Sequence, residues 1–356
     1  MKSKKIFYGL PEINLSHLKV LTDDTGILQH AKYTIPNLSH GYCIDDNARA
    51  LIATTMYYNL KGDRDIYPFI QKYLAFINYS FDEKTKRFAN FMSYDRRWLE
   101  NIGSEDSHGR AIWALGVTIK NIRDKSIRAI SKEIFTSALS VVEHFSSPRA
   151  LAFTVLGLWK YLEVDPKDLE KRKIQRILGE KIYSLYKKTA TSDWFWFEET
   201  ITYSNGVLPH ALILVGKYSN DKKMYDTGIK SLKWLLKIQT ALEGHLSIIG
   251  NEGWLTKGKD KASFGQQTVE AMCLLNACLH VYRTTKDQWW LNEGNRCIAW
   301  FFGENDLKTP IYNYEDGGFR DGLDSHGVSQ NQGAESTLAG LISLINMYEI
   351  KAENFK

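Results

Sequence analysis

Acidic residues stand in pairs directly in front of apolar segments of this chain. Asp45 and Asp46 precede one such segment, and Glu105 and Asp106 precede the next. A helix start needs one N-cap, so each pair leaves one carboxyl group available for ligand binding or catalysis. Two neighbouring carboxyl groups can serve as proton donor and proton acceptor, as the hydrolysis of a glycosidic bond requires. The candidate catalytic carboxylates are Asp46 and Asp106, and Glu199 and Glu335 are the alternative candidates for the same roles.

The residues near these carboxylates suit the recognition of a sugar. In the segment 194–199, Trp194 and Trp196 stand beside Glu198 and Glu199. Indole faces stack on apolar C–H surfaces, and carboxylates accept hydrogen bonds from hydroxyl groups. The segment could instead plug the core, although burying unpaired charge is costly. The candidate binding residues are Asp45, Arg49, Glu105, His108, Arg110, Trp194, Trp196, Glu198, His210, Gln267, Glu270, Asp324 and His326.

Each candidate also has a structural interpretation. An aspartate in front of an apolar helix is a common N-cap. Glu270 and Glu335 follow Gln267 and Gln332 at the three-residue spacing of a capping box. A single histidine such as His210 serves as a satisfied structural group as readily as a binding group.

The motifs of metal and nucleotide sites are missing from the sequence. The segment 314–326 is rich in glycine and acid, but it lacks the ligand spacing of a calcium loop, and we expect it to close over a binding site. There is no Walker motif, no G-x-G-x-x-G, no G-x-S-x-G and no H-E-x-x-H. We therefore expect neither a metal nor a cofactor.

Composition describes an ordinary globular protein of 356 residues. Hydrophobic residues make up 44% and charged residues 24%, which excludes a disordered, collagen-like or disulfide-based chain. A net charge of +5 is too mild to indicate nucleic-acid binding. The basic start is not followed by the apolar stretch of a signal peptide, and no apolar run is long enough to span a membrane. The four cysteines form no C-x-x-C, so we expect reduced thiols and a cytoplasmic protein.

Six segments are apolar on nearly every side, and each follows a polar loop. A helix with this pattern is buried all round. Small residues such as Gly116 and Gly157 would let neighbouring helices approach closely. The segments are 48–58, 110–117, 149–162, 208–218, 269–282 and 334–348.

Amphipathic segments alternate with the apolar ones. Ile127, Ile130 and Ile134 form one apolar stripe, and the segments 167–188 and 222–242 show the same pattern. Six buried helices alternating with about six surface helices predict an all-α fold, the (α/α)6 barrel, in which an inner ring lies inside an outer ring. An open helical array is the alternative, but its exposed ends would need capping.

The expected barrel brings distant polar loops together. We expect residues 1–35 to pack on the barrel as an N-terminal extension and residues 36–356 to form the barrel as a single domain. The inner helices of such a ring point their N-termini to one face. Helix N-termini favour acidic groups, so the polar clusters should meet in one funnel.

A longer motif carries a family resemblance. The string His40–Leu51, HGYCIDDNARAL, together with 22–31, resembles a bacterial family of six-hairpin, glycosidase-like proteins. Members of that family are sometimes described as glycosyltransferases or fused to them, and others occur beside mannoside-phosphorylase genes. The resemblance covers essentially the whole chain and carries over no catalytic residue. It implies a helical toroid, a carbohydrate substrate, and a glycosyltransferase or phosphorylase as a pathway partner.

These patterns lead to one preferred function and two alternatives. The preferred function is an inverting glycoside hydrolase that acts on short, mannose-containing oligosaccharides through two carboxyl groups. A sugar epimerase or isomerase would instead use histidine as acid and base, with His108, His210 and His326 as candidates. A non-catalytic glycan-binding module that assists a glycosyltransferase is the third hypothesis.

Overall fold

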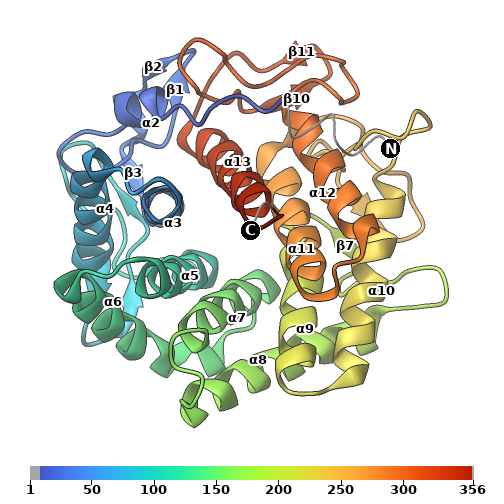
Figure 1. Ribbon diagram of the computed structural model, residues 1–356, viewed down its shortest axis with the longest axis horizontal. Helices are drawn as coiled ribbons and strands as arrows, with labels where there is room; N and C mark the ends of the chain where they lie inside the picture. The colour runs from blue at the N-terminus through green and yellow to red at the C-terminus, as the bar shows by residue number, and fades with distance from the viewer. Residues whose placement is uncertain (1–8, 355–356) are drawn as a thin grey trace.

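Six inner helices form a closed ring. The computed structural model describes residues 9–354. Each inner helix packs against the next, and the last returns to the first, so that the ring closes (Figure 1). The inner helices are α3 (Ile44–Lys61), α5 (Glu105–Asn121), α7 (Pro148–Leu162), α9 (Val207–Tyr218), α11 (Thr268–Thr285) and α13 (Ala334–Asn354).

A second ring of helices surrounds the first. Each long outer helix packs against the inner helix that precedes it in the chain, and the short α2 (Ser16–Leu21) packs against α13. The long outer helices are α4 (Tyr67–Ser80), α6 (Lys125–Ala138), α8 (Leu169–Thr189), α10 (Lys222–Ile238) and α12 (Gln288–Phe301). The chain is an (α/α)6 barrel, and this prediction is confirmed. None of the described helices is long and apolar enough to cross a membrane.

The inner helices are buried on almost every side because they lack an exposed polar stripe. In α11, for example, every residue from Thr268 to Tyr282 except Asn276 is buried. Glycines allow the closest approach, between α5 and α7. A Cβ atom on Gly109 would lie 2.6 Å from the carbonyl oxygen of Ala150, and Gly116 and Gly157 face each other's helix backbone in the same way. Larger side chains at these positions would push the two helices apart.

The long outer helices are amphipathic, and four of them, α6, α8, α10 and α12, begin at aspartate N-caps, whereas α4 follows Ile66 without a side-chain cap. Asp124 caps α6 through the backbone N–H groups of Ser126 and Ile127, and Asp221 caps α10 through that of Met224. Of the predicted apolar stripe of α6, Ile127 and Ile134 are buried and Ile130 is half-buried, and Phe135 is buried as well.

The two faces of the barrel differ in the length of their loops. At the C-terminal ends of the inner helices the connections are short, for example 122–124, 219–221 and 286–287. At the N-terminal ends the loops are long and contain paired antiparallel strands. The strands are β1 (Ala31–Lys32), β2 (Ile35–Pro36), β3 (Tyr42–Cys43), β4 (Phe81–Asp82), β5 (Arg87–Phe88), β6 (Phe91–Met92), β7 (Thr200–Ile201), β8 (Leu255–Thr256), β9 (Gln266–Gln267), β10 (Gly322–Asp324) and β11 (Gly327–Val328).

The strands pair across the long loops. β3 pairs with β6, β7 with β8, and β10 with both β9 and β11. The last of these sheets contains Leu323, inside the segment expected to close over the site. Short 3-10 helices cover Leu38–His40, Arg64–Ile66 and Leu139–His144.

The N-terminal segment packs on the barrel through α2. Leu18 and Leu21 are fully buried, and Nε2 of His17 lies 2.8 Å from the carbonyl oxygen of Gln332, next to α13. The boundary between residues 35 and 36 stays a prediction, and the basic start at residues 1–5 lies outside the described residues. All four cysteines are buried and free.

Candidate active site

The N-terminal ends of the inner helices surround a polar pocket. Its volume is about 320 Å³, and it lies among the long loops. Two predicted binding residues, Arg110 and Gln267, line it together with the alternative catalytic candidate Glu335. The other lining residues are Tyr203, Ser204, Asn251, Trp254 and Val269.

Asp46 lies at the start of α3 behind this pocket. Neither Asp45 nor Asp46 caps the helix, since the N-cap position is Cys43 and no side chain there makes a capping bond. The Asp46 carboxylate instead accepts hydrogen bonds from Nη1 of Arg49 at 2.9 Å and from the thiol of Cys43 at 3.1 Å. Burial raises the pKa of Asp46 to about 6, against the opposing effect of Arg49.

Arg49 joins the buried Asp46 to the pocket. Its Nη2 donates to the Glu335 carboxylate at 2.6 Å, across 286 positions of sequence. The Glu335 side chain remains 43% exposed and faces the pocket. Beside this pair, Nη1 of Arg110 lies 3.2 Å from the Asp45 carboxylate. One pocket-facing carboxylate and one buried carboxylate therefore share a single guanidinium group.

Asp106 does not line the pocket but contacts Tyr203, which does. It is buried and accepts hydrogen bonds from the hydroxyl groups of Ser147 and Tyr203, the second at 2.5 Å. Burial, followed by this bond to Asp106, raises the pKa of Tyr203 far above its ordinary value. Tyr203 therefore stays protonated, and Asp106 positions its ring at the pocket wall.

Two other predicted residues stabilise neighbouring loops. The Glu105 carboxylate accepts the backbone N–H groups of Ser146 and Ser147 at 2.8 and 2.6 Å, at the start of α7. Glu270 does the same for the residues before α9, which lacks a side-chain N-cap of its own. Such N–H groups would otherwise be unsatisfied, so both glutamates complete helix starts across the ring. Burial raises the pKa of Glu270 to about 7.

Arg149 organises the loop between α8 and α9. Its guanidinium donates to the Glu198 carboxylate at 2.6 Å, to the Tyr203 carbonyl at 2.6 Å and to the Thr202 hydroxyl at 2.8 Å. Glu198 is therefore an ion-pair partner within the wall. Glu199 points elsewhere: its carboxylate is 68% exposed and lies 3.9 Å from Lys257.

The aromatic segment 194–197 belongs to the core. Trp194 and Trp196 are buried, and Trp194 packs edge-on against Trp234 of α10, with ring centroids 5.1 Å apart. The structure thus does not bring these two tryptophans to the pocket, because α10 offers them an aromatic partner between the two rings of helices. Their burial agrees with the alternative interpretation of this segment, in which its aromatic side chains fill the core.

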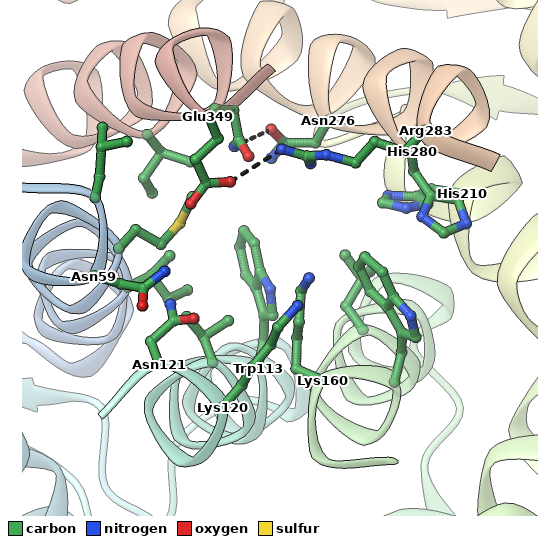
Figure 2. Close-up of a pocket in the computed structure, with 18 of the residues that line it drawn as sticks. Asn59, Trp113, Lys120, Asn121, Lys160, His210, Asn276, His280, Arg283 and Glu349 are labelled. Atoms are coloured by element: carbon green, nitrogen blue, oxygen red, sulfur yellow. Dashed lines mark hydrogen bonds and ion pairs between the residues drawn. The ribbon is translucent and has the colours of Figure 1, made fainter. Parts of the chain in front are cut away.

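The predicted histidines are scattered. His108 is fully buried between Phe88 and Phe145, with Nε2 3.0 Å from the Ala138 carbonyl oxygen, and burial lowers its pKa to about 3. His210 lines a different cavity at the opposite end of the barrel (Figure 2). His326 is exposed in the turn between β10 and β11, next to Asp324. None of these three histidines lines the N-terminal pocket.

Trp254 is the functional candidate that sequence reasoning missed. It lies half-buried in the pocket wall with φ at +58°, in the left-handed region that L-residues rarely adopt. Holding a bulky residue there costs of order 1–3 kcal/mol, and seven other non-glycine residues of the described chain also have positive φ, so the placement of Trp254 in the pocket wall is what makes it a candidate. The sequence signal was the placement of this tryptophan directly after Gly253, in the long loop between α10 and α11.

The charged side chains around the funnel are mostly paired with one another: Arg49 with Asp46 and Glu335, Arg110 with Asp45, and Arg149 with Glu198. Of the charged side chains, Arg110 and Glu335 line the pocket. A lining of paired charges and hydrogen-bonding groups suits the hydroxyl groups of a neutral ligand. Among residues 9–354 there is no group of three or more His, Cys, Asp or Glu side chains placed to hold a metal ion.

Comparison with known proteins shows the fold and no more. No protein-family model and no curated protein matches the chain. Among solved structures, it is similar to cellobiose 2-epimerase from Bacillus thermoamylovorans B4167, at 13% identity and a TM-score of 0.74 over 98% of each chain. It is similar to a D-mannose isomerase at 10% identity and a TM-score of 0.71, over 94% of this chain and 96% of the other.

The chain is also similar to a glycosidase of the same architecture. The GH76 α-1,6-mannanase of Salegentibacter sp. HEL1_6 matches at 13% identity and a TM-score of 0.61, over 93% of this chain and 95% of the other. An inactive variant of that mannanase, solved with α-1,6-mannotriose, has two consecutive aspartates replaced by asparagine. The chain therefore shares its (α/α)6 barrel with a sugar epimerase, a sugar isomerase and a mannanase.

Proposed function

We propose that the N-terminal funnel is the active site of a glycoside hydrolase that acts on short oligosaccharides, mannose-containing ones among them. The observation that carries the proposal is the Glu335–Arg49–Asp46 arrangement. It places one partly exposed carboxylate, Glu335, in the pocket and links it through Arg49 to Asp46, a buried carboxyl group of raised pKa. The consecutive pair Asp45–Asp46 at the start of α3 adds support, since the inactive mannanase variant lacks a consecutive aspartate pair.

The roles follow from the surroundings of each carboxyl group. Glu335 accepts a hydrogen bond from Arg49 at 2.6 Å and faces the pocket, a position that suits a base taking a proton from the attacking water. Asp46, with a pKa of about 6, retains its proton up to mildly acidic pH. It would protonate the leaving oxygen once bound substrate brings that oxygen within hydrogen-bonding distance of its carboxyl group, which lies behind the pocket in this structure. The expected inversion at the anomeric carbon requires the two carboxyl groups to stand about 6.5–9.5 Å apart, with the attacking water between them and the sugar.

The pH dependence of the reaction tests the role of Asp46. We expect kcat/KM to fall about tenfold per pH unit above about pH 6, because the free enzyme then loses the proton of the acid. In Asp46→Asn this alkaline limb should vanish and the remaining rate should be low at every pH. An alkaline limb that persists in Asp46→Asn would assign the acid to another group.

The same group affects stability in a defined direction. The pKa of Asp46 is higher in the folded state than its ordinary 3.8, so the folded protein binds this proton more tightly. Its contribution to the free energy of unfolding is therefore fully present below about pH 4 and is lost as the pH rises through about 6.

Trp254 is expected to form the stacking surface for a sugar ring. Replacing it in Trp254→Gly removes the ring and also relieves the left-handed backbone, which glycine adopts freely. We expect KM to rise about tenfold, equivalent to about 1.4 kcal/mol of lost binding, while the urea midpoint stays within about 1 kcal/mol of wild type. An unchanged KM would remove Trp254 from the binding surface.

A sugar epimerase or isomerase is the second candidate. It is favoured by the overall shape, since the TM-score is 0.74 to a cellobiose 2-epimerase and 0.61 to the mannanase. Of the three predicted histidines, His326 alone lies in the loops of the N-terminal face. In this case His326 would be the acid–base group, and His326→Gln would abolish turnover while Asp46→Asn would not.

One experiment separates these reactions. The protein is incubated with α- and β-linked manno- and gluco-oligosaccharides, with and without phosphate. Time-resolved proton NMR then follows the signals of the sugars. New anomeric signals mean cleavage, and the anomer formed first decides between inversion and retention. A changed sugar without cleavage means epimerisation, and a sugar phosphate formed only with phosphate means phosphorolysis. Silence with every sugar would favour a glycan-binding module for a glycosyltransferase.

A further inference from the structure

A larger cavity lies at the opposite end of the barrel. Its volume is about 510 Å³, within the range of small-molecule sites, and it is lined by the C-terminal halves of α3, α5, α7, α11 and α13, with His210 from α9 (Figure 2). Among the described residues, the connections between inner and outer helices at this end are short. The proposed hydrolytic mechanism uses none of its residues.

Three buried polar atoms at the wall of this cavity have no hydrogen-bond partner among the described residues. They are Nε2 of His210, Nε2 of His280 and Nε1 of Trp159. Both histidines are only 3% exposed, their ring centroids lie 5.2 Å apart, and the Trp159 ring lies 4.7 Å from His280. Other buried polar atoms of the described residues are unpaired as well, but these three are grouped at the wall of one cavity, where a ligand could pair with them.

The two imidazoles are neutral. Burial lowers the pKa of His210 to about 3 and that of His280 well below its ordinary value, and the nearby Lys160 acts in the same direction. A neutral imidazole offers one N–H group and one lone pair. The cluster can therefore donate to and accept from an uncharged group such as a hydroxyl.

The charges at the mouth of the cavity are already balanced. Lys120 and Lys160 share Glu163 at 2.5 and 3.3 Å, and Arg283 pairs with both Glu349 and Glu353 at 3.0 Å. Burial also lowers the pKa of Lys160 to about 7, so this amine is a weak partner for an anion at neutral pH. A neutral ligand fits this cavity better than a phosphate or a carboxylate.

The remaining lining combines an indole with amides. Trp113 projects into the cavity, and one face of its ring stacks on Phe153, at 5.6 Å between centroids and an interplanar angle of 19° (Figure 2). Asn346 donates to Asn276 at 2.9 Å, which leaves each amide further hydrogen-bonding capacity. Asn59 lies at the edge of the same cavity (Figure 2). An apolar ring surface framed by amides matches a sugar, which has apolar faces and hydroxyl edges.

We propose that this cavity binds a neutral mono- or disaccharide, whose ring lies against Trp113 and whose hydroxyl groups pair with His210 and His280. The site is distinct from the N-terminal funnel and does not depend on the proposed hydrolase activity. Binding at this end would let the protein respond to a sugar that is not at the funnel.

Side-chain NMR tests the site directly, without relying on turnover. The protein, labelled with ¹⁵N at histidine and tryptophan side chains, is titrated with four sugars, mannose, glucose, mannobiose and cellobiose, and separately with adenosine as a comparison ligand. At about 10 mM sugar, a site with a millimolar dissociation constant is mostly occupied. We expect saturable shifts of the His210, His280 and Trp159 signals with at least one sugar.

Variants confirm where the sugar binds. His280→Phe keeps an aromatic ring but removes both ring nitrogens, and it should weaken binding about tenfold, the effect of one lost hydrogen bond. Asn276→Ala, at a half-buried position, is the second variant in case the first does not fold. The matched control is Trp254→Gly in the funnel, which should leave the His210 and Trp159 titration unchanged.

Three results would overturn the proposal. The first is the absence of saturable shifts at His210, His280 and Trp159 with all four sugars. The second is unaltered affinity in both His280→Phe and Asn276→Ala. The third is a response to adenosine alone, which would replace the saccharide with a nucleobase ligand. If funnel variants lose turnover but the sugar-induced shifts of His210, His280 and Trp159 remain, the proposal for this second site is supported independently of the hydrolase activity.

Discussion

Glu335→Gln is expected to lower kcat by about 10²–10⁴-fold, the usual contribution of a positioned acid or base. The amide keeps the size of the side chain but cannot accept the proton of an attacking water. Because Glu335 is 43% exposed and Arg49 retains Asp46 as a partner, the fold should persist. The measurement is the initial rate of cleavage by NMR, on an oligosaccharide that the wild-type protein cleaves.

The matched control is Glu133→Gln on α6, where an exposed glutamate lies on the outer surface. It should leave kcat within about twofold of wild type, since surface substitutions away from special features have small effects. A second test uses Glu335→Ala with azide, which needs no general base to attack. Recovery of a glycosyl azide would identify Glu335 as the base, whereas equal rates in Glu335→Gln and Glu133→Gln would refute its role.

Arg149→Ala is expected to lower the free energy of unfolding by about 3–5 kcal/mol, as breaking a buried ion pair does. The Arg149 side chain is 3% exposed and donates to Glu198, the Tyr203 carbonyl and the Thr202 hydroxyl. Its removal leaves these acceptors without their donor inside the wall of the funnel. The measurement is urea-induced unfolding followed by circular dichroism, with the m-value checked for constancy.

Arg176→Ala provides the comparison for the same residue type. Arg176 and Glu180 form an exposed pair at 2.9 Å along α8, with side chains 63% and 50% exposed. An exposed pair contributes about 0.2–1 kcal/mol, so this variant should unfold close to wild type. Similar losses of stability in Arg149→Ala and Arg176→Ala would mean that the buried network does not stabilise the loop before α9.

The architecture could be predicted from local patterns alone. The six apolar segments each became an inner helix, and the stripe of Ile127, Ile130 and Ile134 became one outer helix, α6. Periodicity and burial are linked in every helix, so a segment without a polar side must lie inside the barrel. The polar loop before each inner helix also followed from the sequence, and with it the polar character of one face.

The tasks of the individual acids were decided by the tertiary structure. Glu105 and Glu335 look alike in sequence, as acids in the first turn of an inner helix. Glu105 binds N–H groups at Ser146 and Ser147, whereas Glu335 meets Arg49 and faces the pocket. The partners lie 41 to 286 positions away in the chain, so the local pattern contains no information about them.

The directions of the aromatic side chains and histidines also depended on the assembled ring. Trp194 packs against Trp234 and does not line the pocket, whereas Trp254 does. His210 stands near the start of α9 yet faces the opposite cavity. Sequence determined which helices are buried, because burial depends on composition and period. The surface that each side chain faces was decided only when the helices packed, because it depends on the rotation and depth of each helix in the ring.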